Sequence, residues 1–130
     1  NHLFANAKAL VIAGLFFDSP EADAWLIKGL RILAREVPEQ LLPDGGHFER
    51  STMYHALALE DMLDLVNATQ CFANRLLPAQ RQQVAEWPKR ARSLHAWLLN
   101  MCHPDGEIGF FNDADARHTD LIGETRVRPQ

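Results

Sequence analysis

The hydrophobic positions along the chain recur at helical spacing, and turn residues divide them into separate helical regions. The first run, Leu3 to Phe17, is rich in Ala and Leu and carries a single charge, which predicts a largely buried helix. The next region offers Ser19 as N-cap and Pro20 at the first helical position, a pattern typical of a helix start. Because the connection is so short, these two helices are expected to run antiparallel, as a hairpin.

A second helix pair is predicted further along the chain. Ser51 is the expected cap of a third helix, which covers about Thr52 to Ala68. Pro78 starts a fourth helical region, and Pro88 is expected to divide it into a short piece and a longer piece ending near residue 101. The pattern therefore indicates an all-α fold built from antiparallel helical hairpins.

Each predicted hairpin is followed by a loop with the same motif. The second helix is expected to break at Pro38, and the loops contain Pro43-Asp44-Gly45 and Pro104-Asp105-Gly106, whose aspartates lie 61 positions apart (105 − 44). A hairpin cannot bury its apolar faces alone, so stacked copies build a solenoid or close into a ring. We therefore expect residues 1–130 to be one partial repeat domain, with an irregular polar tail over 115–130.

Composition narrows the class of protein. The chain has 130 residues, of which 47% are apolar and 23% charged, values that fit one soluble globular domain. Thirteen Lys and Arg against seventeen Asp and Glu give a net charge of −4, so no broad basic field is available for nucleic acid or for an anionic membrane. The apolar runs are too short for a membrane span. Cys71 and Cys102 show no paired spacing and are expected to be buried free thiols.

The segment from Leu41 to Leu63 concentrates ionisable side chains at a helix start. Arg50, His47 and Tyr54 are expected to gather at one end of the third helix, where a guanidinium would favour the phenolate form of the tyrosine. Such a tyrosine can exchange protons with a substrate near neutral pH. The alternative interpretation is a half-buried aromatic side chain whose hydroxyl bonds to the backbone.

Asn1 and His2 form a second polar pair, directly ahead of the first apolar helix. Simple capping by Asn1 is the alternative interpretation of this pair. Metal binding is not expected, because neither an HExxH motif nor a paired CxxC is present. The carboxylates of residues 60, 61 and 64 are predicted to form a solvated helix face. Among the tryptophans, Trp25 and Trp97 are predicted to lie in the core, and Trp87 is the one left open for a ligand.

Three stretches together resemble the heparinase II/III-like polysaccharide lyases, in the part of their chain that forms the (α/α) toroid. The stretches are "NHLFANAKALVIAGLFF", "LLPDGGHFERSTMYHALALEDMLDL" and "HPDGEIGFFNDA". In that family an Asn-His pair and a tyrosine some fifty positions later face one cleft, and here His2 and Tyr54 are 52 positions apart (54 − 2). The resemblance places Asn1 and His2 on the Asn-His motif and Tyr54 on the catalytic tyrosine. Arg50, His47 and Glu49 belong to the same block and are expected to contact substrate.

The resemblance implies β-elimination at a uronic acid within an anionic polysaccharide such as alginate or a glycosaminoglycan. Asn1 and His2 would neutralise the substrate carboxylate, Tyr54 would act as acid or as both base and acid, and His2 is the other candidate base. No metal or other cofactor is required. Family members also have further toroid helices and a C-terminal β-sandwich, which are expected partners of this region within the same polypeptide.

Two other functions fit parts of the pattern. A noncatalytic helical-repeat module could bind polysaccharide or a partner protein through the polar loop. A glycoside hydrolase on a similar helical ring would need two opposed carboxylates. A lyase for external polysaccharide would be periplasmic or secreted, whereas a lyase for a biosynthetic product would stay in the cytoplasm.

Overall fold

The computed structural model describes residues 2–112 and 114, and the regular secondary structure within them is helical. Asn1 and the predicted irregular tail over 115–130 lie outside the described residues. The elements in chain order are α1 (His2–Phe16), α2 (Pro20–Gln40), α3 (Thr52–Cys71), the 3₁₀ turn η1 (Ala73–Arg75), α4 (Pro78–Val84) and α5 (Trp87–Met101). The prediction of an all-α chain is confirmed.

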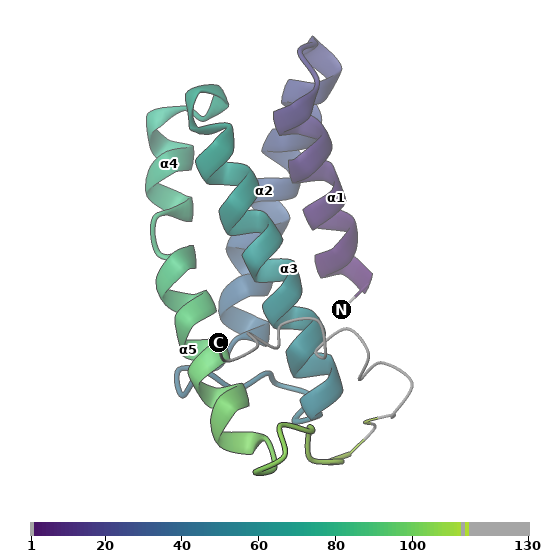
Figure 1. Ribbon diagram of the computed structural model, residues 1–130. Coiled ribbons are helices and arrows are strands. Elements are labelled where there is room, and N and C mark those ends of the chain that lie inside the picture. The colour runs from purple at the N-terminus through teal and green to yellow at the C-terminus, as the bar shows by residue number, and fades with distance from the viewer. Residues whose placement is uncertain (1, 113, 115–130) are drawn as a thin grey trace.

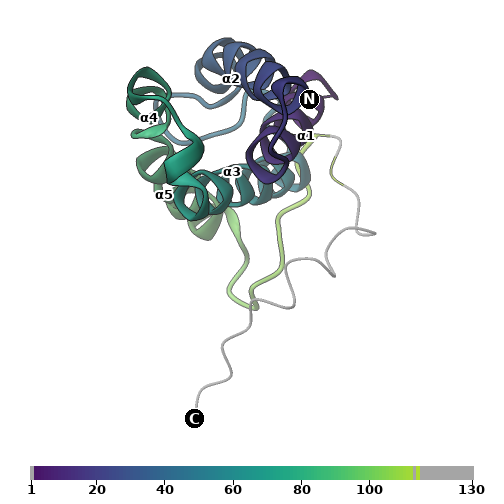
Figure 2. The same cartoon turned by 90° about the horizontal axis from the view of Figure 1, so that it is seen from above.

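The helices form two antiparallel hairpins that pack side by side (Figure 1). In the first hairpin α2 returns along α1, and in the second α4 and α5 together return along α3. Seen from above, four helical columns surround a common interior (Figure 2). The two long loops that follow the hairpins lie at one end of this bundle, the end where α3 begins (Figure 1).

Local capping signals set the starts of α2 and α3. The hydroxyl of Ser19 accepts a hydrogen bond from the backbone N–H of Ala22 (3.1 Å), and Pro20 occupies the first turn of α2. The hydroxyl of Ser51 accepts from the backbone N–H of Tyr54 (3.4 Å) at the start of α3. Both predicted caps are confirmed, and α3 extends to Cys71, three residues beyond the predicted end.

The prediction that Pro38 ends the second helix was wrong. Pro38 lies inside α2, which continues to Gln40. A proline removes one backbone hydrogen bond, a small loss so close to the end of a helix. The last turn has other bonds: the backbone N–H of Leu41 donates to the carbonyl of Val37 (3.0 Å), and the side chain of Gln40 donates to Glu36 (2.9 Å).

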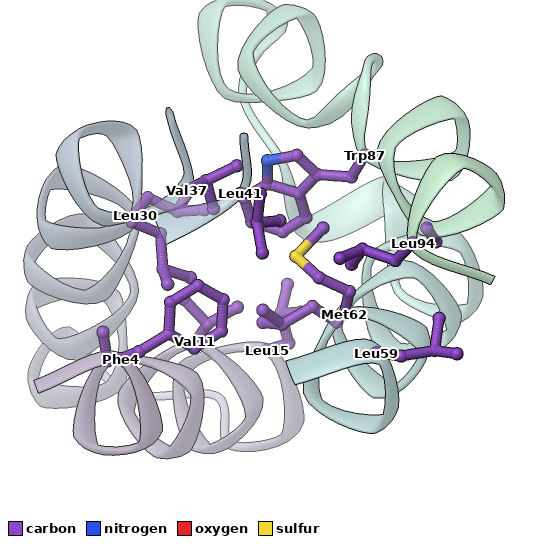
Figure 3. Packing of buried hydrophobic residues seen from close by; sticks show 14 of the residues in the cluster. Phe4, Val11, Leu15, Leu30, Val37, Leu41, Leu59, Met62, Trp87 and Leu94 are labelled. Carbon is purple, nitrogen blue, oxygen red and sulfur yellow. The ribbon is translucent and has the colours of Figure 1, made fainter. Parts of the chain in front are cut away.

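The core lies between the four columns and draws on every α-helix except the short α4 (Figure 3). Trp87 is 3% exposed and its indole points into this interior, whereas Trp25 on α2 is 39% exposed. The core prediction was therefore wrong for Trp25, Trp97 is half-buried, and Trp87, which the sequence left open, lies in the core. Both cysteines are free, as expected, but Cys71 is exposed and Cys102 is only half-buried.

Glycines bring α1 and α2 into close contact. A Cβ atom at Gly14 would lie 2.6 Å from the backbone nitrogen of Leu26, and a Cβ atom at Gly29 would lie 2.8 Å from the carbonyl oxygen of Ala7. Neither position has room for a methyl group unless the helices move apart. The first hairpin is therefore held at a spacing that only glycine permits.

The second hairpin repeats the first with an insertion. Pro20 and Pro78 both begin a returning helix and are 58 positions apart (78 − 20), whereas the ends of those helices, Gln40 and Met101, are 61 apart (101 − 40). The difference of three residues is taken up where the chain breaks between α4 and α5. One continuous helix in the first hairpin thus corresponds to a helix in two pieces in the second.

Candidate functional site

The loop after α2 turns back sharply at its Pro-Asp-Gly motif. The backbone N–H of Gly45 donates to the carbonyl of Leu42 (3.0 Å), and the N–H of Gly46 donates to the carboxylate of Asp44 (2.9 Å). Gly45 has a φ of +89°, a conformation that glycine adopts without cost. A single β-bridge between Leu41 and His47 closes the loop and places His47 beside the end of α2.

The loop after α5 repeats this turn 61 positions later. A β-bridge joins Cys102 to Ile108, Gly106 has a φ of +88°, and the carboxylate of Asp105 accepts from the N–H of Glu107 (3.0 Å). The repeat seen in the sequence is therefore a repeat of backbone geometry. Both loops lie at the same end of the bundle, so their polar residues meet there (Figure 1).

The segment after the second loop is tied to the residues that precede α3. The hydroxyl of Thr52 donates to the carbonyl of Gly109 in a short hydrogen bond. The side-chain amide of Asn112 donates to the carbonyls of Glu49 (3.2 Å) and Arg50 (2.9 Å). These bonds hold two segments that are 57 to 63 residues apart in sequence against each other.

Arg50 adopts a backbone conformation that is unusual for a residue with a side chain. Its φ is +54°, in the left-handed region, and Asn112 opposite it has a φ of +53°. The backbone N–H of Arg50 donates to the carbonyl of His47 (3.0 Å). Strain of this kind persists only where surrounding contacts impose it, and it occurs often at functional sites.

His55 connects the first loop to α5. Its Nδ1 accepts a hydrogen bond from the backbone N–H of His47 (3.2 Å), so its Nε2 carries the proton and donates to the carbonyl of Leu94 (2.9 Å). The ring stacks on Trp97 with centroids 4.4 Å apart. Burial lowers the pKa of His55, so the ring stays neutral and serves as a structural link.

His47 is the more unusual of the two histidines. Its side chain is only 3% exposed, and its Nδ1 has no hydrogen-bond partner among the described residues. Burial, helped by the neighbouring His55, lowers the pKa of His47 to about 4. His47 is therefore a neutral imidazole at neutral pH, with a buried Nδ1 that has no partner among the described residues.

A hollow of about 410 Å³ lies at this junction and has His47 in its wall. Its lining combines apolar and aromatic side chains with charged and amide groups. The lining residues are Leu42, Asp44, Gly46, His47, Arg50, Trp97, Met101, Phe111 and Asn112. The predicted substrate contacts His47 and Arg50 thus come together in one concave site.

Tyr54 on α3 is not among the residues that line this hollow. It is half-buried and packs against the hydrophobic core. Seven residues, about two turns, separate it from Asp61 on the same stripe of the helix. Asp61 accepts from the amine of Lys8 on α1 (2.7 Å). The face that carries Tyr54 is therefore the face that meets α1.

The ion pair between Lys8 and Asp61 also shows how far along the bundle His2 lies relative to Tyr54. α1 and α3 run in the same direction (Figure 1), and His2 lies six residues before Lys8, while Tyr54 lies seven before Asp61. Both residues consequently sit in the first turns of neighbouring helices, at the same end of the bundle. Lys8 also pairs with Asp64 (2.5 Å), so these carboxylates link two helices and do not form the purely solvated face that we predicted.

Sequence reasoning did not single out Asn112, Phe111 or Met101 as site residues, and it assigned Trp97 to the core. Each lies about fifty or more positions from the first loop, and only the fold brings them to it. The repeated Pro-Asp-Gly motif was the available signal, because repeats of one hairpin place equivalent loops at one end. Glu49, the remaining predicted contact, is half-buried beside this site.

Comparison with known proteins finds a matching family model and similar curated proteins. The family model described as heparinase II/III N-terminus matches residues 1–126. A heparin-sulfate lyase of Bacteroides stercoris is 30% identical over 115 residues, which cover 88% of this chain and 16% of the relative. A heparin-sulfate lyase of Bacteroides thetaiotaomicron is 26% identical over 98% of this chain and 19% of the relative. The chain thus spans less than a fifth of the length of these relatives, and no solved structure matches it.

Proposed function

Because the chain belongs to the heparinase II/III N-terminus family, we propose that the intact gene product is a polysaccharide lyase that cleaves an anionic polysaccharide by β-elimination at a uronic acid. The observation that carries the proposal is the family match, which includes the Asn-His pair, the Pro-Asp-Gly loop and the start of α3. The position of Tyr54 on the face of α3 that meets α1 is consistent with a cleft shared with His2.

The difficult step of such a reaction is removal of the proton at C5 of the uronate. The proton is poorly acidic because its loss places negative charge beside a carboxylate. Hydrogen bonds from Asn1 and His2 would offset that charge. A base takes the C5 proton, the electron pair forms the C4–C5 double bond, the C4–O4 bond breaks, and an acid protonates O4. Tyr54 is the proposed acid, and His2 or Tyr54 itself is the proposed base.

The chain is proposed to form part of an (α/α) toroid, completed by further helices and a β-sandwich of the same polypeptide. The outer face of α1 supports this. The exposed side chains of Ile12 (36%) and Phe16 (66%) on this helix, and of Phe17 (53%) directly after it, line a second hollow of about 530 Å³. An apolar patch of this kind usually marks a contact surface. Helices that complete the toroid would cover it.

A lyase for an external polysaccharide would act in the periplasm or outside the cell, and we propose that location. Among the described helices, none has both the length and the apolar character needed to cross a membrane. The polysaccharides to be tested as substrates begin with heparin sulfate, because both curated relatives are heparin-sulfate lyases. Other glycosaminoglycans and alginate follow it.

The test offers the intact gene product each polysaccharide and follows the ultraviolet absorbance of the conjugated double bond that elimination creates. We expect a signal with at least one substrate, and a loss of more than about 100-fold in kcat for Tyr54→Phe, the scale of losing general acid–base catalysis. His95→Gln, at an exposed position of α5, is the control. Absence of signal across the panel, with glycan binding unaffected by Tyr54→Phe, would instead favour a binding module.

A further inference from the structure

The hollow beside the first Pro-Asp-Gly loop is lined by residues of the two loops and α5, and His55 on α3 stacks on one of them, Trp97. His55, which borders the loop and α5, and Tyr54, on the stripe that leads to Asp61, are successive residues and point about 100° apart on the helix. The hollow is therefore adjacent to the proposed cleavage cleft without being the same place. A polymeric substrate that enters the cleft can extend into it.

The polar groups of the hollow suit hydroxyl groups. His47 lines the hollow, and its Nδ1 is buried and has no partner among the described residues. The amide nitrogen of Asn112 is engaged by the two carbonyls of the first loop, which leaves its Oδ1 as the acceptor for a ligand. Asp44 uses one carboxylate oxygen to hold Gly46 and can accept from a hydroxyl with the other.

The other residues that line the hollow suit a sugar ring that carries an anionic group. Trp97 and Phe111 offer aromatic surface, and Phe111 is 50% exposed. Apolar C–H faces of a pyranose pack on such rings. Arg50 supplies a guanidinium, which binds carboxylate or sulfate through paired hydrogen bonds. Asp44 would repel an anion placed next to it, so the anionic group must lie toward Arg50 and the hydroxyl groups toward Asp44.

We propose that this hollow is a carbohydrate subsite that binds one anionic sugar residue neighbouring the cleaved one, with Arg50 on its carboxylate or sulfate and Trp97 and Phe111 against its ring. The proposal rests on the proposed function only in taking the sugar to be part of the lyase substrate. A volume of about 410 Å³ is within the range of pockets that hold small ligands.

The test measures binding and turnover of size-fractionated acidic oligosaccharides by the intact gene product. Calorimetry uses a Tyr54→Phe background so that the ligand is not consumed. We expect Arg50→Gln to weaken the affinity for longer oligosaccharides about tenfold or more, the usual scale of a charge-assisted hydrogen bond, and to reduce the salt dependence of binding. In the otherwise unchanged enzyme the same substitution should raise KM and leave kcat within about threefold.

Two further variants keep the result interpretable. Phe111→Ala removes an exposed ring and should weaken binding without unfolding the protein, whereas Arg92→Gln removes an exposed cation on α5 outside the hollow and should change nothing. Carboxyl-reduced and desulfated oligosaccharides then identify the anion, because the effect of Arg50→Gln disappears with whichever group Arg50 binds. Affinities for Arg50→Gln and Phe111→Ala equal to that of the parent protein, or an equal loss in Arg92→Gln, would overturn the proposal.

The two proposals fail in different ways. Elimination by the unchanged enzyme with a KM that Arg50→Gln does not alter refutes the subsite and leaves the lyase intact. Binding that depends on Arg50, in a protein that forms no double bond from any substrate, refutes the lyase and supports the subsite.

Discussion

At the scale of single residues, the loop end of the bundle is built on neutral histidines and strained backbone. His47 and His55 are buried as uncharged rings, and Arg50 is held at a φ of +54° by hydrogen bonds from Asn112 and to His47. Burying these polar groups and holding the backbone in this conformation both lower the free energy of unfolding. The energetic consequences can be measured without knowing the substrate.

The first prediction concerns acid stability. The pKa of His47 is about 4 in the folded protein, below the ordinary value near 6.5, so between these pH values the unfolded chain binds more protons than the folded one. This contribution to stability is fully present above pH 6.5 and is lost as the pH falls toward 4. The shift corresponds to at most about 3 kcal/mol. Urea unfolding of the intact protein should therefore show a free energy that falls steeply over this window.

The matched variants identify the source of that slope. His47→Gln cannot titrate and should flatten the dependence between pH 6.5 and 4, whereas His95→Gln, at an exposed position, is the control for losing a histidine. An unchanged slope in His47→Gln would show that the acid sensitivity arises elsewhere.

The second prediction separates the backbone of Arg50 from its charge. Arg50→Ala and Arg50→Gly both remove the guanidinium, but only glycine adopts a φ of +54° without steric cost. We expect the glycine variant to be more stable than the alanine variant by about 1 kcal/mol, and both to lose the same affinity for acidic oligosaccharides. Equal stability of the two variants would argue against strain at this position.

Individual site residues were only partly predictable from the sequence. Arg50 and His47 share a loop, and their proximity follows from local spacing. Their separation from Tyr54 could not be predicted, because it depends on which face of α3 meets α1 and which meets α5. The assignment of catalytic roles to Asn1, His2 and Tyr54 remains a prediction.

At the scale of elements, local chemistry explains where the helices begin better than where they end. Ser19 and Ser51 were predicted as caps because a cap is decided by a few neighbouring residues. Pro38 was misjudged because side-chain and backbone bonds elsewhere in the last turn of α2 offset its missing donor. Trp25 was misjudged and Trp87 was left open because the packing of the bundle decides which aromatic side chains point inward.

The third prediction tests the glycine contact within the first hairpin. In an isolated helix Gly→Ala would stabilise by about 1 kcal/mol, but a Cβ atom at position 29 would lie 2.8 Å from both the Ala7 carbonyl oxygen and a methyl group of Val11. We expect Gly29→Ala to lower the free energy of unfolding by about 1–3 kcal/mol. Lys28→Ala, at the exposed neighbouring position, should change it by less than about 0.5 kcal/mol.

An unchanged free energy of unfolding in Gly29→Ala would contradict this prediction. If Gly29→Ala proved as stable as the parent protein, the helices of the first hairpin would be free to move apart, and their spacing would not depend on glycine.

At the scale of the whole molecule, the chain is two copies of one hairpin with a repeated loop at one end. The repeat of the Pro-Asp-Gly motif was visible in the sequence. The three-residue insertion between α4 and α5 was not, because the sequence indicated only that a proline divides this helical region. The hollow could not be foreseen, since it forms between Trp97 on α5 and two loops that the fold brings together. Closure into a toroid remains a proposal that rests on the open face of α1.

The fourth prediction tests whether that face is covered in the intact gene product. In a background that lacks Cys71 and Cys102, Ile12→Cys should react with a maleimide at least about tenfold more slowly than Gln82→Cys, at an exposed position of α4. Both cysteines should react at similar rates after unfolding in urea. Equal rates in the native protein would mean that no further helices cover α1.

The masses of the products distinguish elimination from hydrolysis of the glycosidic bond. We would digest a defined acidic oligosaccharide to completion with the intact protein and measure the mass of both fragments by mass spectrometry. We expect the two fragments to sum to the mass of the substrate, because elimination adds no water, and the fragment with the new non-reducing end to be unsaturated. Fragments that together exceed the substrate by one water molecule would show that the protein is a hydrolase and not a lyase.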